Sequence, residues 1–145
     1  MINISKEKWG FDSNIIIYAL DKKSPFFLKT EEFFASIEKS NFFITQQNII
    51  EIEKVLITFY HLDKKDVVKR VGLFLESFEF ALVTPRPSTL MKYHEILKLY
   101  KRKSFFDLYL ASTYLDNEVC NFFTVNVKDF KGIPDFKPLN PFKLV

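Results

Sequence analysis

The feature that most limits the folds open to this chain is an alternation of short apolar stretches with longer segments of helical periodicity. The apolar stretches end at residues 9–11 or occupy residues 41–45, 80–85 and 121–126. Strands of this kind, each separated from the next by a helical segment, are typical of a parallel sheet covered by helices. The sequence therefore predicts an α/β fold with a mostly parallel central sheet flanked by helices.

The helical segments are expected from apolar residues that recur at helical spacing. Asp63 fits the N-cap of one of these helices, and Pro25 fits the first position of another, where a proline needs no N–H partner. Residues 13–20 are compatible with a helix or with a continued strand, because a short apolar run does not distinguish them. The other expected helices span residues 26–40, 46–60, 63–78, 89–103 and 104–119.

Length and composition favour one globular domain over residues 1–145, since 48% of the residues are hydrophobic and no linker or repeat interrupts the chain. No apolar run approaches the length of a membrane span, and the first ten residues lack the apolar core of a signal peptide. We therefore expect a cytoplasmic protein without a membrane anchor.

The residues available for metal binding point to oxygen ligands. Cys120 is the only cysteine, and His61 and His94 do not have the spacing of a zinc site. Any metal would therefore be held by oxygens, which favours Mg²⁺ or Mn²⁺. The net charge of +3 permits a nucleic-acid partner without requiring one.

Three acidic residues lie near predicted strand ends or helix starts, and each has a structural alternative. Asp12 fits a helix N-cap or a metal ligand. Glu51 fits a surface pair with a neighbouring lysine or a ligand. Asp107 fits a capping box with Ser104 or a ligand. Because ligands gather at the carboxyl ends of parallel strands, we expect Asp12, Glu51 and Asp107 to converge on one pocket there, with Glu53 outside it.

The last predicted strand ends in a hydroxyl, an amide and a carboxylate, contributed by Thr124, Asn126 and Asp129. Asn and Asp are also ordinary turn residues, so this group alone does not establish a site. Its position after a core strand makes it a candidate to complete the acidic pocket.

With these residues identified, the chain resembles the PIN-domain ribonucleases, and among them the VapC-like toxins of bacterial and archaeal toxin–antitoxin pairs. "FDSNIIIYAL" is similar to the opening motif of that family, and "FFTVNVKDFKGIPDFKPLNP" is similar to its closing strand and turn. "TQQNIIEIEKVL" and "SFFDLYLASTYL" resemble its two middle motifs, with Glu51 and Asp107 in the acidic positions. The resemblance runs from about residue 8 to residue 142.

The resemblance implies a PIN-like fold and an endoribonuclease that hydrolyses RNA phosphodiester bonds with Mg²⁺ or Mn²⁺. It makes Asp12, Glu51 and Asp107 the metal ligands, and Ser13 and Thr124 supporting residues. Many PIN domains carry a fourth acid where this chain has Asn126. Either Asp129 supplies that charge as a fourth catalytic acid, or Asn126 acts as a neutral ligand.

The same resemblance implies an RNA substrate and a cognate antitoxin as partners. Candidate RNA-binding residues precede Asp107 or flank the last motif, although a solvated charged loop is the alternative; they are Lys101, Arg102, Lys103 and Lys128. Eighteen phenylalanines suggest a sticky surface for a second copy and the antitoxin. We expect Phe26, Phe27, Phe33 and Phe34 to form it, unless they are core residues.

A catalytically silent PIN-like domain that serves as a binding or scaffold module is the alternative function, and Asn126 makes it possible. Receiver domains and dehalogenase-type phosphatases fit less well. Both classes have a second acidic residue close to the first. In the phosphatases it would lie two positions after Asp12, where this chain has Asn14.

Overall fold

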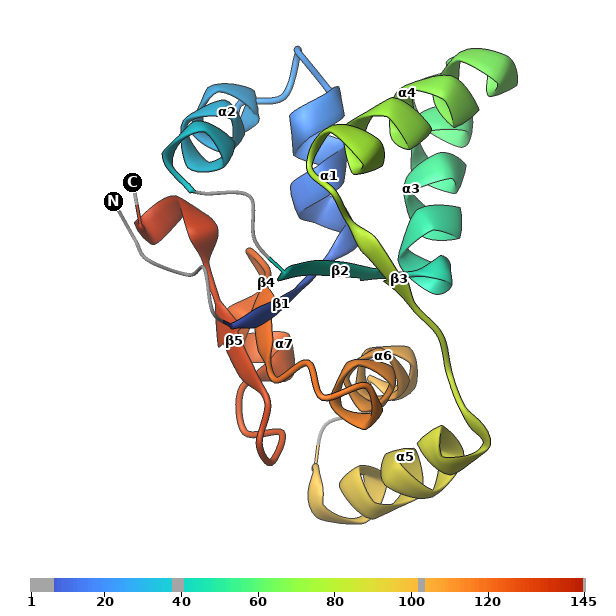
Figure 1. Ribbon diagram of the computed structural model, residues 1–145, viewed down its shortest axis with the longest axis vertical. Helices are drawn as coiled ribbons and strands as arrows, with labels where there is room; N and C mark the ends of the chain where they lie inside the picture. The colour runs from blue at the N-terminus through green and yellow to red at the C-terminus, as the bar shows by residue number, and fades with distance from the viewer. Residues whose placement is uncertain (1–6, 38–40, 102–103, 145) are drawn as a thin grey trace.

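The computed structural model describes residues 7–37, 41–101 and 104–144. Within these ranges the chain forms a five-stranded sheet in the order β3-β2-β1-β4-β5, and all neighbouring strands are parallel (Figure 1). The predicted α/β fold with a parallel central sheet is confirmed. The strands are β1 (Lys8–Phe11), β2 (Asn41–Thr45), β3 (Ala81–Val83), β4 (Asn121–Phe123) and β5 (Lys137–Leu139).

The central strand β1 brings together two segments that are far apart in the sequence. Phe11 at its carboxyl end is fully buried and lies in register with Phe123 at the end of β4. The N–H of Asp12 continues this pairing and donates to the carbonyl of Phe123 at 2.9 Å. Residues that follow β1 and β4 therefore emerge side by side at one edge of the sheet.

The helices form a layer on each face of the sheet, with α1 to α4 on one face and α5 to α7 on the other (Figure 1). Each layer has its own buried apolar cluster against the sheet. None of the described helices is long and apolar enough to cross a membrane. The helices are α1 (Ser13–Leu20), α2 (Phe27–Ser36), α3 (Gln46–Thr58), α4 (Lys64–Ser77), α5 (Pro87–Leu99), α6 (Phe105–Asp116), α7 (Val127–Phe130) and the 3₁₀ helix η1 (Pro141–Lys143).

Helix starts follow the sequence signals in part. Residues 13–20 form a helix, and Asp63 caps α4 by accepting from two backbone N–H groups of its first turn. The prediction for Pro25 is wrong, because α2 begins only at Phe27. A turn at Ser24 precedes the helix: its side chain accepts from the N–H of Phe26 at 3.1 Å, and its carbonyl accepts from that of Phe27.

The end of the chain differs from the prediction. The strand expected over residues 121–126 ends at Phe123, and α7 and β5 follow it without having been predicted. β5 is a three-residue edge strand whose middle residue is Pro138, so it carries little strand signal. The strand is held from either side of the proline, since Lys137 N donates to Cys120 O and Leu139 O accepts from Thr124 N.

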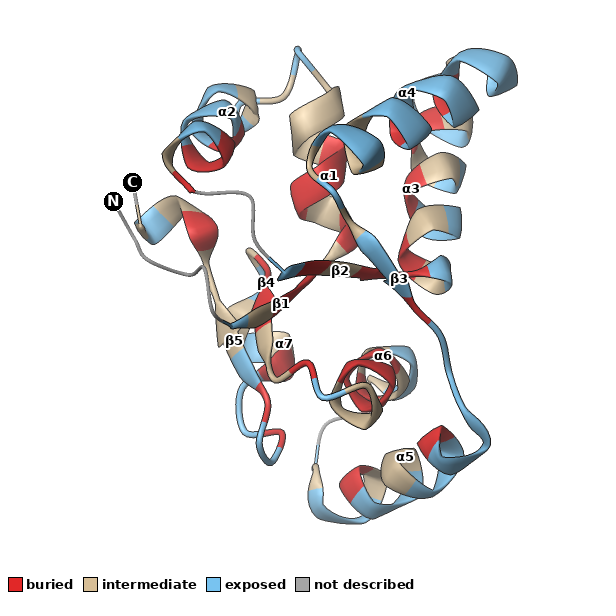
Figure 2. Cartoon of the chain, viewed as in Figure 1, coloured by how far each residue is buried: buried red, intermediate tan, exposed pale blue. Residues whose placement is uncertain are grey.

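The predicted phenylalanine surface is wrong for two of its four members. Phe33 and Phe34 are buried core residues of α2, and Phe33 packs edge-on against Phe123. In Figure 2 one side of α2 is buried and the other is exposed. Phe27 is half-buried, and Phe26 is 37% exposed and stacked on Phe142. The core alternative therefore applies to Phe33 and Phe34, because α2 turns this pair toward the sheet.

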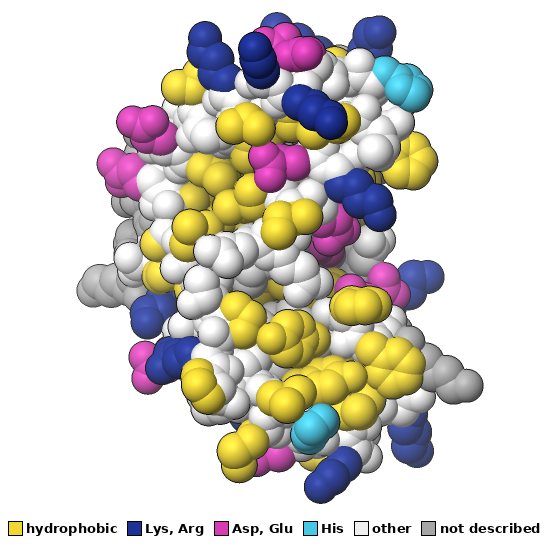
Figure 3. All heavy atoms as spheres, turned by 90° about the vertical axis from the view of Figure 1, so that its right-hand side faces the viewer, with side chains coloured by type: hydrophobic (Ala, Val, Ile, Leu, Met, Phe, Trp, Pro, Cys, Tyr) yellow, Lys and Arg dark blue, Asp and Glu magenta, His cyan; other side chains and the backbone are white. Residues whose placement is uncertain are grey.

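Exposed apolar side chains gather instead over α5 and α6, in the lower part of the face shown in Figure 3. Leu90 and Met91 on α5 are 53% and 69% exposed. Phe105 and Phe106 at the start of α6 are 53% and 79% exposed. We use the name α5–α6 patch for Leu90, Met91, Phe105 and Phe106. The start of α5 lies beside the end of α6, so Leu90 and Met91 lie toward one end of this helix pair and Phe105 and Phe106 toward the other.

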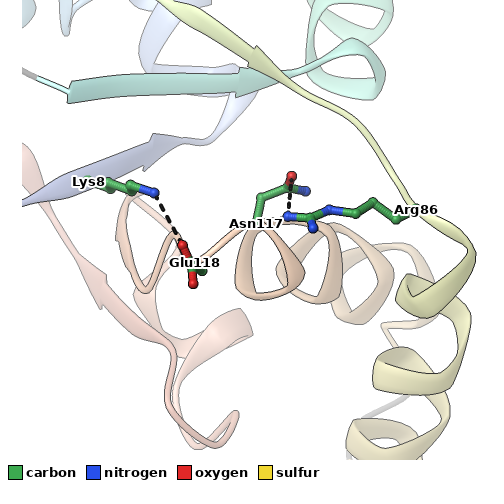
Figure 4. Close-up of polar contacts among 4 residues, drawn as sticks. All are labelled: Lys8, Arg86, Asn117 and Glu118. Atoms are coloured by element: carbon green, nitrogen blue, oxygen red, sulfur yellow. Dashed lines mark hydrogen bonds and ion pairs between the residues drawn. The ribbon is translucent and has the colours of Figure 1, made fainter.

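The turn after α6 ties that helix to its neighbours (Figure 4). Arg86, just before α5, donates from Nη2 to Asn117 Oδ1 at 3.1 Å, and Asn117 Nδ2 donates to the carbonyl of Thr84. An ion pair joins Lys8 and Glu118 at 3.7 Å, but both side chains are exposed and the pair contributes little stability. The amide of Asn117 therefore links the end of α6 to the segment leading into α5.

Candidate active site

Asp12 lies at the junction of β1 and α1, where hydrogen bonds hold both of its carboxylate oxygens. Oδ1 accepts from the N–H of Ser13 at 2.9 Å, which makes Asp12 the N-cap of α1. Oδ2 accepts from the Thr124 hydroxyl at 2.7 Å. Asp12 is thus a helix cap, and it also faces the residue that follows β4.

The charge of Asp12 is destabilised by its surroundings. Burial raises the pKa of this carboxyl from its ordinary value of 3.8 to about 6, and the negative charges of Glu51 and Asp107 add to the effect. The hydrogen bonds from Thr124 and Ser13 act in the opposite direction and lower the pKa. Near neutral pH, Asp12 is therefore an ionised but poorly solvated carboxylate whose charge a cation would stabilise.

Glu51 is an exposed residue of α3, and its charge acts on both Asp12 and Asp107. Of the two described glutamates in this stretch, Glu51 raises the pKa of these aspartates, whereas Glu53 is not among the causes of either shift. The three predicted ligands therefore lie within electrostatic range of one another, although they come from three different elements.

Asp107 is half-buried in the first turn of α6. Burial raises its pKa, the nearby charge of Asp129 raises it further, and that of Glu51 adds a smaller effect. The predicted capping box is not formed: within the described part of the chain, the Ser104 side chain accepts no hydrogen bond from a backbone N–H of the helix. Ser104 instead hydrogen-bonds the Asp107 carboxylate, which lowers the pKa of Asp107.

The residues after β4 have different surroundings. Thr124 is fully buried, and its hydroxyl donates to Asp12 and accepts from the N–H of Asn126. Asn126 is exposed at the start of α7, and among the described residues its side chain makes no capping hydrogen bond to that helix. Asp129 is half-buried on α7, and its charge acts on Asp107. Thr124 therefore orients Asp12, and Asp129 adds a further negative charge that acts on Asp107.

The predicted RNA-binding residues are only partly described. Lys101 is exposed after the end of α5, and Lys128 is exposed on α7 next to Asp129. Arg102 and Lys103 lie outside the described residues. Both described lysines are therefore exposed to solvent, and their role in RNA binding stays a prediction.

The acidic residues suit a hard divalent cation in kind. The candidate donors are carboxylate oxygens, with the amide of Asn126 as the neutral alternative. Burial raises the pKa values of Asp12 and Asp107, and the charges of the neighbouring carboxylates raise them further. Across residues 7–37, 41–101 and 104–144, no three Asp, Glu, His or Cys side chains are grouped closely enough to hold an ion by themselves. Mg²⁺ commonly uses one or two carboxylates together with waters and substrate phosphates, so the donor set fits such an ion without a closed protein cage.

Sequence reasoning missed two buried residues beneath the acidic site. Asn48 on α3 is fully buried, and its Nδ2 donates to Ser13 Oγ at 2.8 Å. Tyr114 on α6 is also fully buried, and its hydroxyl lies 3.0 Å from Asn48 Oδ1. In the sequence, Asn48 belongs to a polar helix start and Tyr114 to an apolar helix, so neither carries a signal of this contact.

A family model described as PIN domain matches residues 11–124. No curated protein matches the sequence significantly.

Several solved structures share the fold of this chain. FitAcB from Neisseria gonorrhoeae has a TM-score of 0.73 at 17% identity, covering 92% of this chain and 98% of that chain. VapBC2 from Rickettsia felis, bound to a promoter DNA fragment, has a TM-score of 0.66 at 20% identity, with 91% and 97% covered. VapC20 from Mycobacterium tuberculosis, a sarcin–ricin loop cleaving toxin, has a TM-score of 0.66 at 12% identity, with 90% and 100% covered.

Proposed function

The chain belongs to the PIN domain family, and from this premise we propose that it is a metal-dependent endoribonuclease and the toxin of a toxin–antitoxin pair. The observation that carries the proposal is the position of Asp12 at the end of the central strand. There its carboxylate is poorly solvated, and the charges of Glu51 and Asp107 help to raise its pKa. Further support comes from VapC20, a sarcin–ricin loop cleaving toxin, and from a toxin–antitoxin complex of Klebsiella pneumoniae with the same fold.

In this proposal Asp12, Glu51 and Asp107 hold a Mg²⁺ or Mn²⁺ ion. When bound, such an ion activates water for attack on the RNA phosphodiester and offsets the charge that develops on the phosphate. Thr124 and Ser13 keep Asp12 oriented through the hydrogen bonds to its two oxygens. No side chain needs to act as a nucleophile.

Asp129 is the proposed fourth acid, and Asn126 is the alternative neutral ligand. Support for Asp129 comes from its charge, which acts on Asp107. Asn126 is exposed at the start of α7. An Asn126→Asp variant distinguishes the two roles, since it should tighten Mn²⁺ binding only if position 126 faces the ion.

The RNA backbone would be held by the predicted basic residues. Lys101 and Lys128 are exposed, Lys128 is next to Asp129 in the sequence, and Arg102 and Lys103 follow Lys101. Their contacts with phosphates would make binding weaken as salt rises. We also propose a cytoplasmic location, in keeping with an RNA substrate.

The proposed protein partners are a cognate antitoxin and a second copy of the chain. The antitoxin is supported by the structural neighbours, whose structures are toxin–antitoxin complexes. A small reading frame beside this gene whose product prevents growth arrest would identify it. For self-association we propose the α5–α6 patch in place of the phenylalanines of α2.

Asp107→Asn provides the central test. The amide keeps the shape of the side chain and can still accept the Ser104 hydrogen bond, but it removes the negative charge that a divalent ion requires. We expect metal-dependent RNA cleavage to fall by orders of magnitude, with circular dichroism and thermal unfolding close to those of wild type.

The controls separate the two functions. Cleavage by wild type should stop on addition of EDTA and return with excess Mn²⁺. A folded wild type that cleaves none of the RNAs tried would favour the silent binding module. Full activity in Asp107→Asn would remove that residue from the catalytic set.

A further inference from the structure

The hydroxyl of Tyr114 is a buried junction between three elements of the fold. Its oxygen donates to the carbonyl oxygen of Phe11 on β1 at 2.9 Å and lies 3.0 Å from Asn48 Oδ1 on α3. The N–H of Phe11 points back at the same oxygen from 3.4 Å. Since Tyr114 itself belongs to α6, one hydroxyl connects β1, α3 and α6.

Each of these elements carries or leads directly into one of the proposed metal ligands. Phe11 immediately precedes Asp12, and Asn48 lies one helical turn before Glu51. Asp107 precedes Tyr114 by seven residues on α6, which is about two turns and places both on the same face of the helix.

The junction continues through Asn48 to the other side of Asp12. Asn48 Nδ2 donates to Ser13 Oγ at 2.8 Å, and Asn48 Oδ1 accepts from the Thr45 hydroxyl at 2.7 Å. Ser13, Thr45, Asn48 and Tyr114 are each at most 2% exposed. The network is therefore shielded from water, which strengthens its hydrogen bonds and fixes their geometry.

The tyrosine ring reaches this position only because the facing residue of β1 is a glycine. A Cβ on Gly10 would lie 2.7 Å from Cε1 and 2.8 Å from Cδ1 of Tyr114. Strand and helix approach each other closely at this pair, and the ring carries its hydroxyl past β1 to α3.

We propose that Tyr114 is a positioning residue, which acts through Phe11 and Asn48 to fix the relative positions of the three elements that present Asp12, Glu51 and Asp107 to a divalent ion and its waters. Like charges on three separate elements repel, so the elements must be held together by contacts other than the carboxylates themselves. The inference rests on the proposed function, and it assigns a role to a residue that does not touch the ion.

The test is Tyr114→Phe, which removes the hydroxyl and keeps the ring against Gly10. Mn²⁺ binding is followed by electron paramagnetic resonance of the free ion, and RNA cleavage is titrated with Mn²⁺. We expect the dissociation constant for Mn²⁺ and the Mn²⁺ concentration for half-maximal cleavage to rise together, by about tenfold or more.

Two control variants remove hydroxyls from the same helix. Tyr109→Phe changes a half-buried residue whose side chain leaves α6 about 200° away from that of Asp107. Ser112→Ala removes a buried hydroxyl that donates only locally, to the carbonyl of Leu108. Both controls should bind Mn²⁺ as wild type does, even where they lower thermal stability.

A second variant, Asn48→Ala, interrupts the same network on α3. It should weaken Mn²⁺ binding. The Asn48→Ala/Tyr114→Phe double variant should bind Mn²⁺ almost as tightly as the more impaired of the two single variants, because both substitutions act through one junction. Multiplied effects in the double variant would contradict the shared junction.

The outcomes separate this inference from the proposed function. A wild type that neither binds Mn²⁺ nor cleaves RNA overturns both. A wild type that does so, together with an inactive Asp107→Asn and a Tyr114→Phe that binds Mn²⁺ normally, overturns the positioning role alone. A Tyr114→Phe variant that only melts earlier shows the hydroxyl to be structural.

Discussion

At the scale of single residues, the charge of Asp12 links stability to pH. The pKa of Asp12 rises from 3.8 to about 6 on folding, so the folded protein holds this proton more tightly than the unfolded chain does. The stabilisation is complete below about pH 3.8 and is lost as pH rises through about 6. At about 1.4 kcal/mol per pKa unit, ionised Asp12 costs the fold up to about 3 kcal/mol at pH 7.

Asp12→Asn should therefore gain stability relative to wild type as pH rises from 4 to 7, by about 2 to 3 kcal/mol. The measurement is urea unfolding of both proteins across this pH range, because the difference between them cancels the titration of other shared groups. A constant difference between the two proteins would mean that Asp12 titrates normally in the folded state.

The same pair tests metal binding without any activity assay. Mn²⁺ should raise the melting temperature of wild type at pH 7, since an ion bound only to the folded state stabilises it. Asp12→Asn should show a much smaller rise. An equal rise in both proteins would place the ion elsewhere.

At the scale of elements, the contact of β1 with α6 can be tested by adding one methyl group. Gly10→Ala places a Cβ within 3 Å of the buried Tyr114 ring and should cost about 1 to 3 kcal/mol. Gly72→Ala in α4 is the matched control, because nothing lies within 4 Å of its new Cβ. There the better helix propensity of alanine should add about 0.5 to 1 kcal/mol of stability.

Chemical denaturation measures the free energy of unfolding of both variants. If both substitutions had effects of the same sign and size, the close approach of Tyr114 to Gly10 would not govern the packing of α6 on the sheet.

Besides the contact of Arg86 with Asn117, a second polar contact joins α5 to α6. Asp116 at the end of α6 accepts from the hydroxyls of Ser88 and Thr89 at the start of α5, at 2.7 and 2.8 Å. These hydrogen bonds lower the pKa of Asp116, so their contribution is present at neutral pH and is lost as pH falls through the lowered value.

Asp116→Ala should therefore lower the free energy of unfolding by about 1 kcal/mol at pH 7, and by less in acid. Asp116→Asn, which keeps one acceptor oxygen, should lose less. Thermal unfolding at pH 7 and pH 3 checks both variants, and a loss that grew in acid would contradict the hydrogen-bonded carboxylate.

At the scale of the whole molecule, the α5–α6 patch is the proposed surface for a second copy. Phe106→Asp places a charge on its most exposed member and should convert a dimer to a monomer. Leu28→Asp on α2 is the matched control, since Leu28 is 71% exposed but lies outside the patch. Light scattering at high concentration measures both, and a monomeric wild type would contradict the proposal.

The sequence alone determined the features that depend on neighbours a few positions away. The alternation of apolar stretches and helical periods gave the fold class, because each element's pattern reflects its own buried face. Asp63 was correctly identified as a cap from its place before a helical run. The Asp12 and Thr124 motifs at strand ends also placed two parts of the candidate site at the same sheet edge.

Tertiary structure decided what depends on contacts between distant segments. β5 exists because β4 offers a free edge beside it, although the sequence around Pro138 has little strand propensity. The fate of Phe33 and Phe34 depended on which side of α2 meets the sheet. In the sequence, Tyr114 does not differ from the other apolar residues of its helix. Only the fold brings its hydroxyl to Phe11, 103 positions away. Local periodicity carries no information about such a pair, because its energy appears only when strand and helix pack together.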